Sequence, residues 1–182
     1  MIILGIDPGY AIVGYGVIEF KSNRFSVVDY GAITTNAGTP FERRLELIYD
    51  DLNLLMGKFH PEAMSIEKLF YNTNAKTVID VAQARGVTVL AAKKNNIPIF
   101  EYTPLQVKQS VVGYGRAEKK QVQEMTRIIL KLAKIPKPDD TADALAMAIC
   151  HAHASGSLMG KLNSMGIRSV SYTHLTLPTN SL

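Results

Sequence analysis

The sequence IILGIDPGYAIVGYGVIEF, residues 2–20, holds two apolar stretches on either side of an Asp-Pro-Gly turn. Residues 2–7 and 12–20 are rich in Ile, Val and Tyr, which is typical of β-strands, and residues 25–33 form a third such stretch after a short Ser/Asn turn. Strands joined by such short connections run antiparallel. The start of the chain therefore predicts a three-stranded antiparallel meander.

After the meander the hydrophobic period changes. Thr39-Pro40-Phe41-Glu42 has the hydroxyl, the proline and the acid of a capping box, and apolar residues at helical spacing follow as far as Phe59. Two further strands are expected at 63–70 and 97–102, and the second is expected at a sheet edge because Pro98 lacks a backbone donor. A long helix is expected at 75–95, and a second capping box (Thr103-Pro104-Leu105-Gln106) opens a short helix. Two further helices are expected at 118–134 and from Asp139 to about Ala154.

This order of elements predicts an α/β fold. We expect a five-stranded mixed sheet, three antiparallel strands followed by two parallel ones, flanked by helices. Residues 1–155 are assigned to this one domain, and residues 156–182 are expected to form a flexible tail because Gly, Ser, Asn and Thr dominate them. The last twelve residues, SYTHLTLPTNSL (171–182), also resemble translated adapter sequence and are expected not to belong to the native protein.

Composition indicates a globular protein. The chain of 182 residues is 47% hydrophobic and 20% charged, and no stretch approaches the roughly 20 apolar residues of a membrane helix. Its single cysteine, Cys150, excludes an internal disulfide and is expected to be an inert core thiol. We therefore expect a cytoplasmic protein without membrane contact.

The positive charge is concentrated in one segment. Residues 105–138 contain eight Lys or Arg side chains against two Glu, a net charge of +6, so the remaining chain carries −2. Such a basic segment favours an anionic polymer partner, most simply nucleic acid. The alternative is a solvated helix face with lysines for solubility.

Four acids are expected to meet at one edge of the sheet. Asp7 ends the first strand, Glu67 lies near the end of the fourth, and Asp140 and Asp143 point to one side of the last helix because they are three residues apart. Clustered carboxylates repel one another, and divalent cations that prefer oxygen ligands relieve that repulsion. Two such ions about 3.5–4 Å apart are a known arrangement for hydrolysing a phosphodiester.

Each acid also has a structural alternative. Asp7 fits a plain Asp-Pro-Gly turn or a phosphate-binding loop, and Glu67 fits an exposed strand end. Asp140 and Asp143 would favour the helix dipole. Asp139, which follows Pro138, is interpreted as the N-cap of the last helix.

Four blocks of the sequence resemble the bacterial RuvC crossover junction endodeoxyribonucleases, in order and at the family's spacing. They are GIDPGYAIVGYGVI (5–18), SIEKLFYNTNAKTVIDVAQARGV (65–87), YTPLQVKQSVVGYGRAEKKQV (102–122) and DDTADALAMAICHAH (139–153). The resemblance covers about residues 2–155. It implies an RNase H-like fold, a homodimer, and cleavage of Holliday junctions with about two Mg²⁺ or Mn²⁺ ions per active site, leaving 5′-phosphate and 3′-hydroxyl ends.

The resemblance also implies roles for individual residues. The acids that match the family's catalytic and metal-binding motifs are Asp7, Glu67, Asp140 and Asp143. The residues implied in DNA binding are Phe70, which would stack on an unpaired base, and Lys108, Arg116 and Lys119, which would contact phosphates. The implied partners are a four-way DNA junction, a second copy of the chain and a RuvA–RuvB branch-migration complex. The helix at 75–95, with its small residues, is the candidate dimer interface.

Two other functions are consistent with parts of the sequence. A sugar kinase or actin-like phosphotransferase also has a Gly-x-Asp-x-Gly strand end, but needs a second phosphate loop and a second lobe that 182 residues do not provide. A non-catalytic junction-binding protein of the same fold would have lost acids, whereas all four are present.

Overall fold

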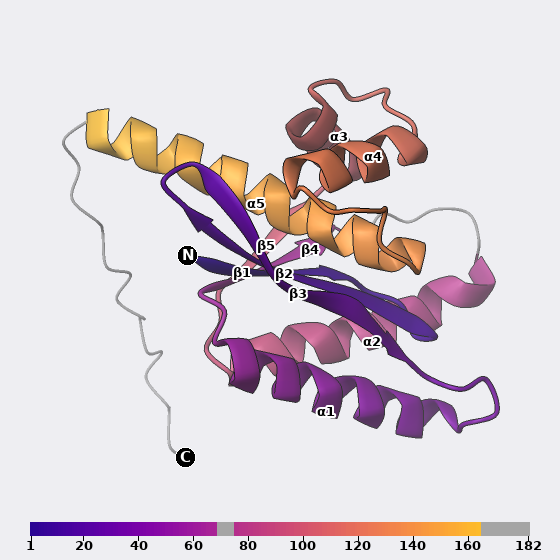
Figure 1. The fold of residues 1–182 in the computed structure, drawn as a ribbon. Helices are drawn as coiled ribbons and strands as arrows, with labels where there is room; N and C mark the ends of the chain where they lie inside the picture. Colours follow the sequence, from indigo (N-terminus) through magenta and orange to yellow (C-terminus); the bar gives the residue numbers. More distant parts are fainter. Residues whose placement is uncertain (69–74, 165–182) are drawn as a thin grey trace, which may run out of the picture.

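The computed structural model describes residues 1–68 and 75–164. A single five-stranded sheet lies between two layers of helices, with α1 and α2 on one face and α3, α4 and α5 on the other (Figure 1). The elements in chain order are β1 (Ile2–Asp7), β2 (Ile12–Lys21), β3 (Arg24–Thr34), α1 (Phe41–Phe59), β4 (Ala63–Glu67), α2 (Ala75–Lys94), β5 (Ile99–Tyr102), α3 (Pro104–Val112), α4 (Lys119–Ile129) and α5 (Asp139–Ser164).

The strand order is β3-β2-β1-β4-β5. The first three strands pair antiparallel, and β4 and β5 continue the sheet parallel to β1. The predicted mixed sheet is therefore confirmed. The edge position of β5 is confirmed as well: Pro98 precedes the strand, and its carbonyl accepts a hydrogen bond from Met64 at 2.8 Å.

The two-residue period of the strands divides the core into two clusters. On β1, Leu4 and Ile6 pack toward α1 and α2, whereas Ile3 packs on the opposite face with residues of α5. Asp7 is four positions from Ile3, so its side chain is on the α5 face of the sheet. Both faces of the central strand are thus covered by helices, and its buried residues are followed at the carboxyl end by the partly exposed Asp7.

The start of α1 and the end of α4 differ from the predictions. Thr39 does not cap α1: its backbone N–H closes a turn with the Asn36 carbonyl, and Pro40, which has no side-chain oxygen, occupies the cap position. Helix α4 ends at Ile129 rather than at residue 134, because Lys131 adopts a left-handed conformation with φ of 55°. The capping box of α3 is confirmed, with Thr103 and Gln106 bonded to each other's backbone.

Helix α5 also differs at both ends. It extends to Ser164, so residues 156–164 of the predicted tail are helical, and Gly156 lies against the ring of Phe20 on β2. Asp139 is the first helical residue instead of the cap before it. Residues 165–182 are outside the described part of the chain. No helix in the described ranges has both the length and the apolarity to cross a membrane.

Candidate active site

Asp7 and Glu67 end two neighbouring strands. Ile6 pairs with Ile66 in the parallel β1–β4 ladder, so the two acids follow side by side at the same edge of the sheet. Leu4 and Ile6, like Met64 and Ile66, pack toward α1 and α2, and alternation places Asp7 and Glu67 on the opposite face. The first two predicted site residues are therefore brought together.

The loop after Asp7 is anchored to its surroundings. The Thr35 hydroxyl donates to the Tyr10 carbonyl at 2.6 Å, and the buried Arg44 donates to the same hydroxyl oxygen at 2.7 Å. The Arg44 guanidinium also lies 4.6 Å from the centre of the Tyr10 ring. The Asp-Pro-Gly segment thus begins an anchored connection between β1 and β2, which fixes the end of β1 and with it the position of Asp7.

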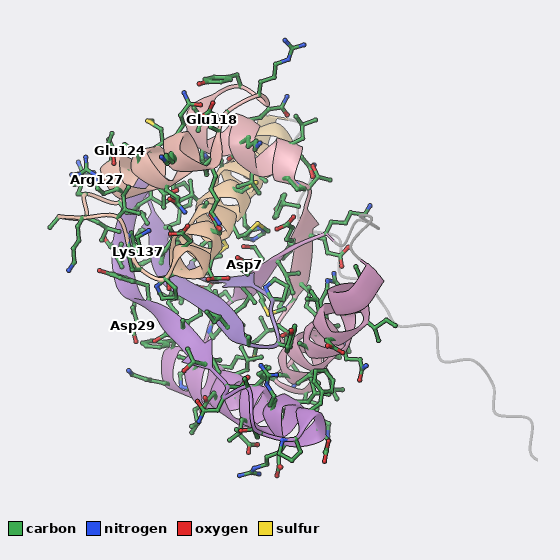
Figure 2. All side chains as sticks on the ribbon, turned by 90° about the vertical axis from the view of Figure 1, so that its right-hand side faces the viewer. Asp7, Asp29, Glu118, Glu124, Arg127 and Lys137 are labelled. Atoms are coloured by element: carbon green, nitrogen blue, oxygen red, sulfur yellow. The ribbon has the colours of Figure 1, made fainter. Side chains whose placement is uncertain are left out.

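The other two acids reach this edge from α5, which crosses the same face of the sheet. The pKa of Asp7 is raised from 3.8 to about 7, first by burial and then by the negative charges of Asp143, Glu67 and Asp140. Burial and the charge of Asp143 raise the pKa of Glu67. Figure 2 shows Asp7 deep between the sheet and the helical layer, away from the outer acids such as Glu118 and Glu124. Asp7 therefore lies within electrostatic range of the three other predicted acids.

Lys119, the first residue of α4, places a positive charge among these acids. Its Nζ lies 2.7 Å from Asp143 Oδ2 and 3.9 Å from Asp139 Oδ2. Burial raises the pKa of Asp143, while the hydrogen bond from Lys119 opposes that rise, and the same hydrogen bond raises the pKa of Lys119. Asp139 pairs mainly with Lys137, at 2.5 Å, which lowers the pKa of Asp139.

A cavity opens above the strand ends. Its polar lining consists of three of the acids and two lysines: Asp7, Glu67, Asp143, Lys108 and Lys119. Its apolar lining comes from α3, α4 and α5 and consists of Pro104, Val107, Val122, Ala146 and Met147. A cavity lined by three acids and two lysines can accept a phosphate group together with metal cations that balance the acids.

The remaining predicted residues lie elsewhere. Asp140 influences Asp7 electrostatically but is not among the residues that line the cavity. Arg116 is exposed on the loop between α3 and α4, also away from that lining. Phe70 lies outside the described residues.

The donor set fits a divalent cation. Carboxylate oxygens are the ligands that Mg²⁺ prefers, and the pKa of Asp7 is raised first by burial and then by the negative charges of three neighbouring acids. In residues 1–68 and 75–164, no three acidic, His or Cys side chains are grouped closely enough to hold an ion as they stand. The paired cation at Asp143 is instead the Lys119 ammonium.

Two features of the site were not predicted from the sequence. The ion pair between Lys119 and Asp143 joins residues of different helices, and the apolar cavity wall comes from helix faces that pattern alone assigns only to the core. The family resemblance had named Lys119 as a phosphate contact, but not as the partner of Asp143. The expectation for Cys150 is met: the thiol is buried, and burial raises its pKa to about 11.

The fold and the acidic strand edge together define a class of protein. A central sheet of order β3-β2-β1-β4-β5, with acids at the ends of adjacent strands and on the helix that crosses them, is the arrangement of RNase H-like nucleases. The family model "Crossover junction endodeoxyribonuclease RuvC" matches residues 3–151 of this chain. The chain belongs to the RuvC family of crossover junction endodeoxyribonucleases, enzymes that hydrolyse phosphodiester bonds in DNA.

Curated relatives agree with this placement. The crossover junction endodeoxyribonuclease RuvC of Ruminiclostridium cellulolyticum is 62% identical over 162 residues, which cover 88% of this chain and 98% of that protein. The protein of the same name from Clostridioides difficile is 58% identical over 166 residues, covering 91% and 98%. These relatives give no support to the phosphotransferase alternative.

Solved structures agree as well. The Thermus thermophilus RuvC structure superposes with a TM-score of 0.78 at 34% identity, covering 88% of this chain and 97% of that one. T. thermophilus RuvC in complex with a Holliday junction substrate gives a TM-score of 0.79 at 30% identity, covering 86% and 96%. The RNase H-like fold expected from the resemblance is confirmed.

Proposed function

We propose that this protein resolves Holliday junctions by metal-assisted hydrolysis of one phosphodiester in each of two strands, with Asp7, Glu67, Asp140 and Asp143 as its catalytic acids. The observation that carries the proposal is that Asp7, Glu67 and Asp143 line one cavity together with two lysines, while Asp140 is near enough to contribute to the raised pKa of Asp7. A related protein has been solved with a Holliday junction substrate, which supports the choice of DNA.

These four acids would hold the cations, Mg²⁺ or Mn²⁺, about two per active site. When bound, such ions lower the pKa of a water nucleophile and stabilise the oxygen that leaves phosphorus. Hydrolysis in which the 3′-oxygen leaves gives a 5′-phosphate and a 3′-hydroxyl. The acids themselves must be ionised to bind the ions, so Asp7 must lose its proton first.

The lysines and the apolar wall have separate tasks. Lys108 and Lys119 line the cavity and would hold the phosphate that undergoes attack. The wall formed by Val107, Val122 and Met147 limits access of bulk water to that phosphate. Arg116, exposed on the α3–α4 loop, would contact a phosphate outside the cavity, and Phe70 would stack on an unpaired base.

A homodimer through α2 would place two such sites on one four-way junction. One stripe of α2 is exposed and apolar or small, with Ile79, Ala82, Gly86 and Leu90 at spacings of three and four. Ile79 and Leu90 are 64% and 51% exposed, and a Cβ at Gly86 would meet no atom within 4 Å. A symmetric contact of two copies of this stripe would bury it and match the two-fold symmetry of the substrate.

The helix does not offer all of its small residues to this interface. Ala84, Ala91 and Ala92 are fully buried in the core of the same chain. They allow α2 to approach the sheet closely, so the proposed contact rests on the outer stripe alone. The cytoplasm as location and the RuvA–RuvB complex as partner remain part of the same proposal and follow from the family resemblance.

The test uses the full chain, a labelled four-way junction and Mg²⁺. Asp7→Asn should bind the junction as tightly as the wild type and fail to cut it, because the amide keeps the shape and loses the charge. Asp29→Asn, a strand acid that lies outside the cavity lining, is the matched control and should cut at the wild-type rate. Cleavage by Asp7→Asn at the wild-type rate, or binding without cleavage by the wild type, would overturn the proposal; the latter would favour a non-catalytic junction binder.

A further inference from the structure

We propose that Gly14 on β2 and Thr141 on α5 are positioning residues for the active site, because together they set where the first turn of α5 lies relative to Asp7. This inference rests on the proposed roles of Asp7 and Asp140. Neither Gly14 nor Thr141 is among the residues that line the cavity, so each would act through Asp140 and not through the substrate.

Gly14 lies directly beneath the backbone of Asp140. A Cβ added to Gly14 would lie closer than 3.0 Å to three atoms: the carbonyl oxygen and carbonyl carbon of Asp140 and the backbone nitrogen of Thr141. Real Cβ atoms essentially never approach other atoms so closely. All three atoms belong to the helix backbone, so no side-chain rotation can make room, and any larger residue must push the first turn of α5 outward.

Gly14 is also the cross-strand partner of Asp7. The two residues oppose each other at the end of the antiparallel β1–β2 ladder. Paired strands lie about 4.8 Å apart, so the surface that supports Asp140 is one strand away from the Asp7 carboxylate. A displacement of α5 at Gly14 therefore changes the separation of two proposed cation ligands without altering either of them.

Thr141 holds the same turn against the sheet. Its hydroxyl donates a hydrogen bond to the carbonyl of Gly31 on β3 at 3.0 Å, and its side chain is fully buried. Gly14 permits the close approach of helix and sheet, and the Thr141 hydrogen bond fixes the helix at that approach. Asp140 thus rests on β2 and Thr141 is bonded to β3, the neighbouring strand. Two contacts on two strands define the position of the first turn of α5.

Gly16, two residues after Gly14 on β2, provides a matched control. Gly16 faces the same helix, but a Cβ there would meet mainly the side chain of Leu145, through its Cδ2 and Cγ atoms at 2.6 and 2.7 Å. A leucine side chain can change rotamer, whereas the carbonyl of Asp140 cannot. Gly16→Ala therefore tests for general loss of packing between β2 and α5, while Gly14→Ala tests for displacement of the carboxylate-bearing turn.

The experiment compares full-length wild type, Gly14→Ala, Gly16→Ala, Thr141→Val and Thr141→Ser. Three quantities are measured: thermal unfolding with EDTA and with Mg²⁺, the Mg²⁺ dissociation constant by calorimetry, and binding of a four-way junction in EDTA. For Gly14→Ala we expect Mg²⁺ affinity to fall at least tenfold and the Mg²⁺-induced rise in Tm to disappear, with junction binding within twofold of the wild type. A crystal structure of this variant should show Asp140 displaced from Asp7 by about 1 Å.

Gly16→Ala should lower Tm but keep the Mg²⁺-induced rise. If Gly14→Ala does not fold, the threonine pair decides: Thr141→Val removes only the hydrogen bond and should weaken Mg²⁺ binding, while Thr141→Ser should restore it. Normal Mg²⁺ affinity in a folded Gly14→Ala, or equal Mg²⁺ affinity in Thr141→Val and Thr141→Ser, would overturn the inference. A wild type that neither binds Mg²⁺ nor gains Tm with Mg²⁺ would instead overturn the proposed function itself. The position of Asp140 in the crystal structure of Gly14→Ala would then test the role of Gly14.

Discussion

The ammonium nitrogen of Lys119 lies 2.7 Å from a carboxylate oxygen of Asp143. One of the four candidate acids is therefore paired with a cation of the protein itself, whereas the pKa of Asp7 is raised to about 7 because burial and its negative neighbours outweigh the attraction of the same lysine. The lysine and a divalent cation would compete for the same negative charge.

Lys119→Met should separate metal binding from catalysis. Removing the ammonium takes away like-charge repulsion toward an incoming cation, about 1 kcal/mol, so the Mg²⁺ dissociation constant should fall roughly fivefold. Junction cleavage at saturating Mg²⁺ should nevertheless slow by roughly 100-fold, because the phosphate loses a positive partner in the cavity. Calorimetry and single-turnover cleavage measure the two effects.

Lys120→Met is the matched control for that variant, since Lys120 is the next residue of α4 and its exposed side chain does not line the cavity. It should leave Mg²⁺ affinity and single-turnover cleavage rate within twofold of the wild type. A Lys119→Met protein that binds Mg²⁺ more weakly than the wild type would contradict competition between the lysine and the ion.

The metal-free protein should lose stability as pH rises from about 4 to about 7. Asp7 has a folded-state pKa of about 7 against 3.8 in the unfolded chain, so in this range the folded state binds more protons and the free energy of unfolding falls with pH. The slope from this one group is at most about 1.4 kcal/mol per pH unit. Burial raises the pKa of Glu67 and Asp143 as well, so both contribute in the same direction.

Urea unfolding in EDTA at several pH values measures this slope. Mg²⁺ should reduce it above pH 6, since the ion binds the ionised acids of the folded state only. Asp7→Asn should remove most of the decrease in the free energy of unfolding with pH in EDTA, because the amide does not titrate. A wild-type stability that stays constant or increases between pH 4 and 7 in EDTA would show that Asp7 is not buried among negative charges.

Phe70→Ala should bind the four-way junction and cut it poorly. Phe70 lies outside the described residues, and the expectation comes from its place three residues after Glu67 in the family motif. Stacking of a base on an aromatic ring contributes roughly 1–3 kcal/mol, so single-turnover cleavage should slow by about fivefold to 150-fold. Phe100→Ala, which removes an exposed ring from β5, should cut normally. Unchanged cleavage by Phe70→Ala would assign its ring to the core.

Leu90→Asp should break the proposed homodimer. A carboxylate in the middle of the exposed α2 stripe would be buried twice in a symmetric contact, once from each copy. Sedimentation should show a monomer at concentrations where the wild type is dimeric, and junctions should be nicked in one strand instead of two. Leu54→Asp alters a leucine on α1 that is even more exposed, at 70%, and should leave the assembly intact. A dimeric Leu90→Asp protein would place the interface elsewhere.

The sequence by itself determined the order of the elements and the position of each acid at the end of an element. Both follow from local patterns: the two-residue period puts Asp7 and Ile3 on one face of β1, and the capping box that opens α3 acts between residues three apart. Local signals were weaker at helix ends. Thr39 carries a hydroxyl that could cap α1, but its backbone N–H donates to the Asn36 carbonyl in a turn. The local sequence pattern did not predict this turn.

Only the tertiary structure decided how the acids are spaced and what balances them. The hydrogen bond from Thr141 to Gly31 joins residues 110 positions apart, and the contact of Gly14 with Asp140 depends on how closely helix and sheet approach. The pairing of Lys119 with Asp143 likewise depends on the docking of α4 against α5. A hydrophobic pattern specifies which face of a helix is buried, but not how closely the helix approaches the sheet or how it is rotated. The packing of the elements therefore sets the spacing and charge balance of the acids.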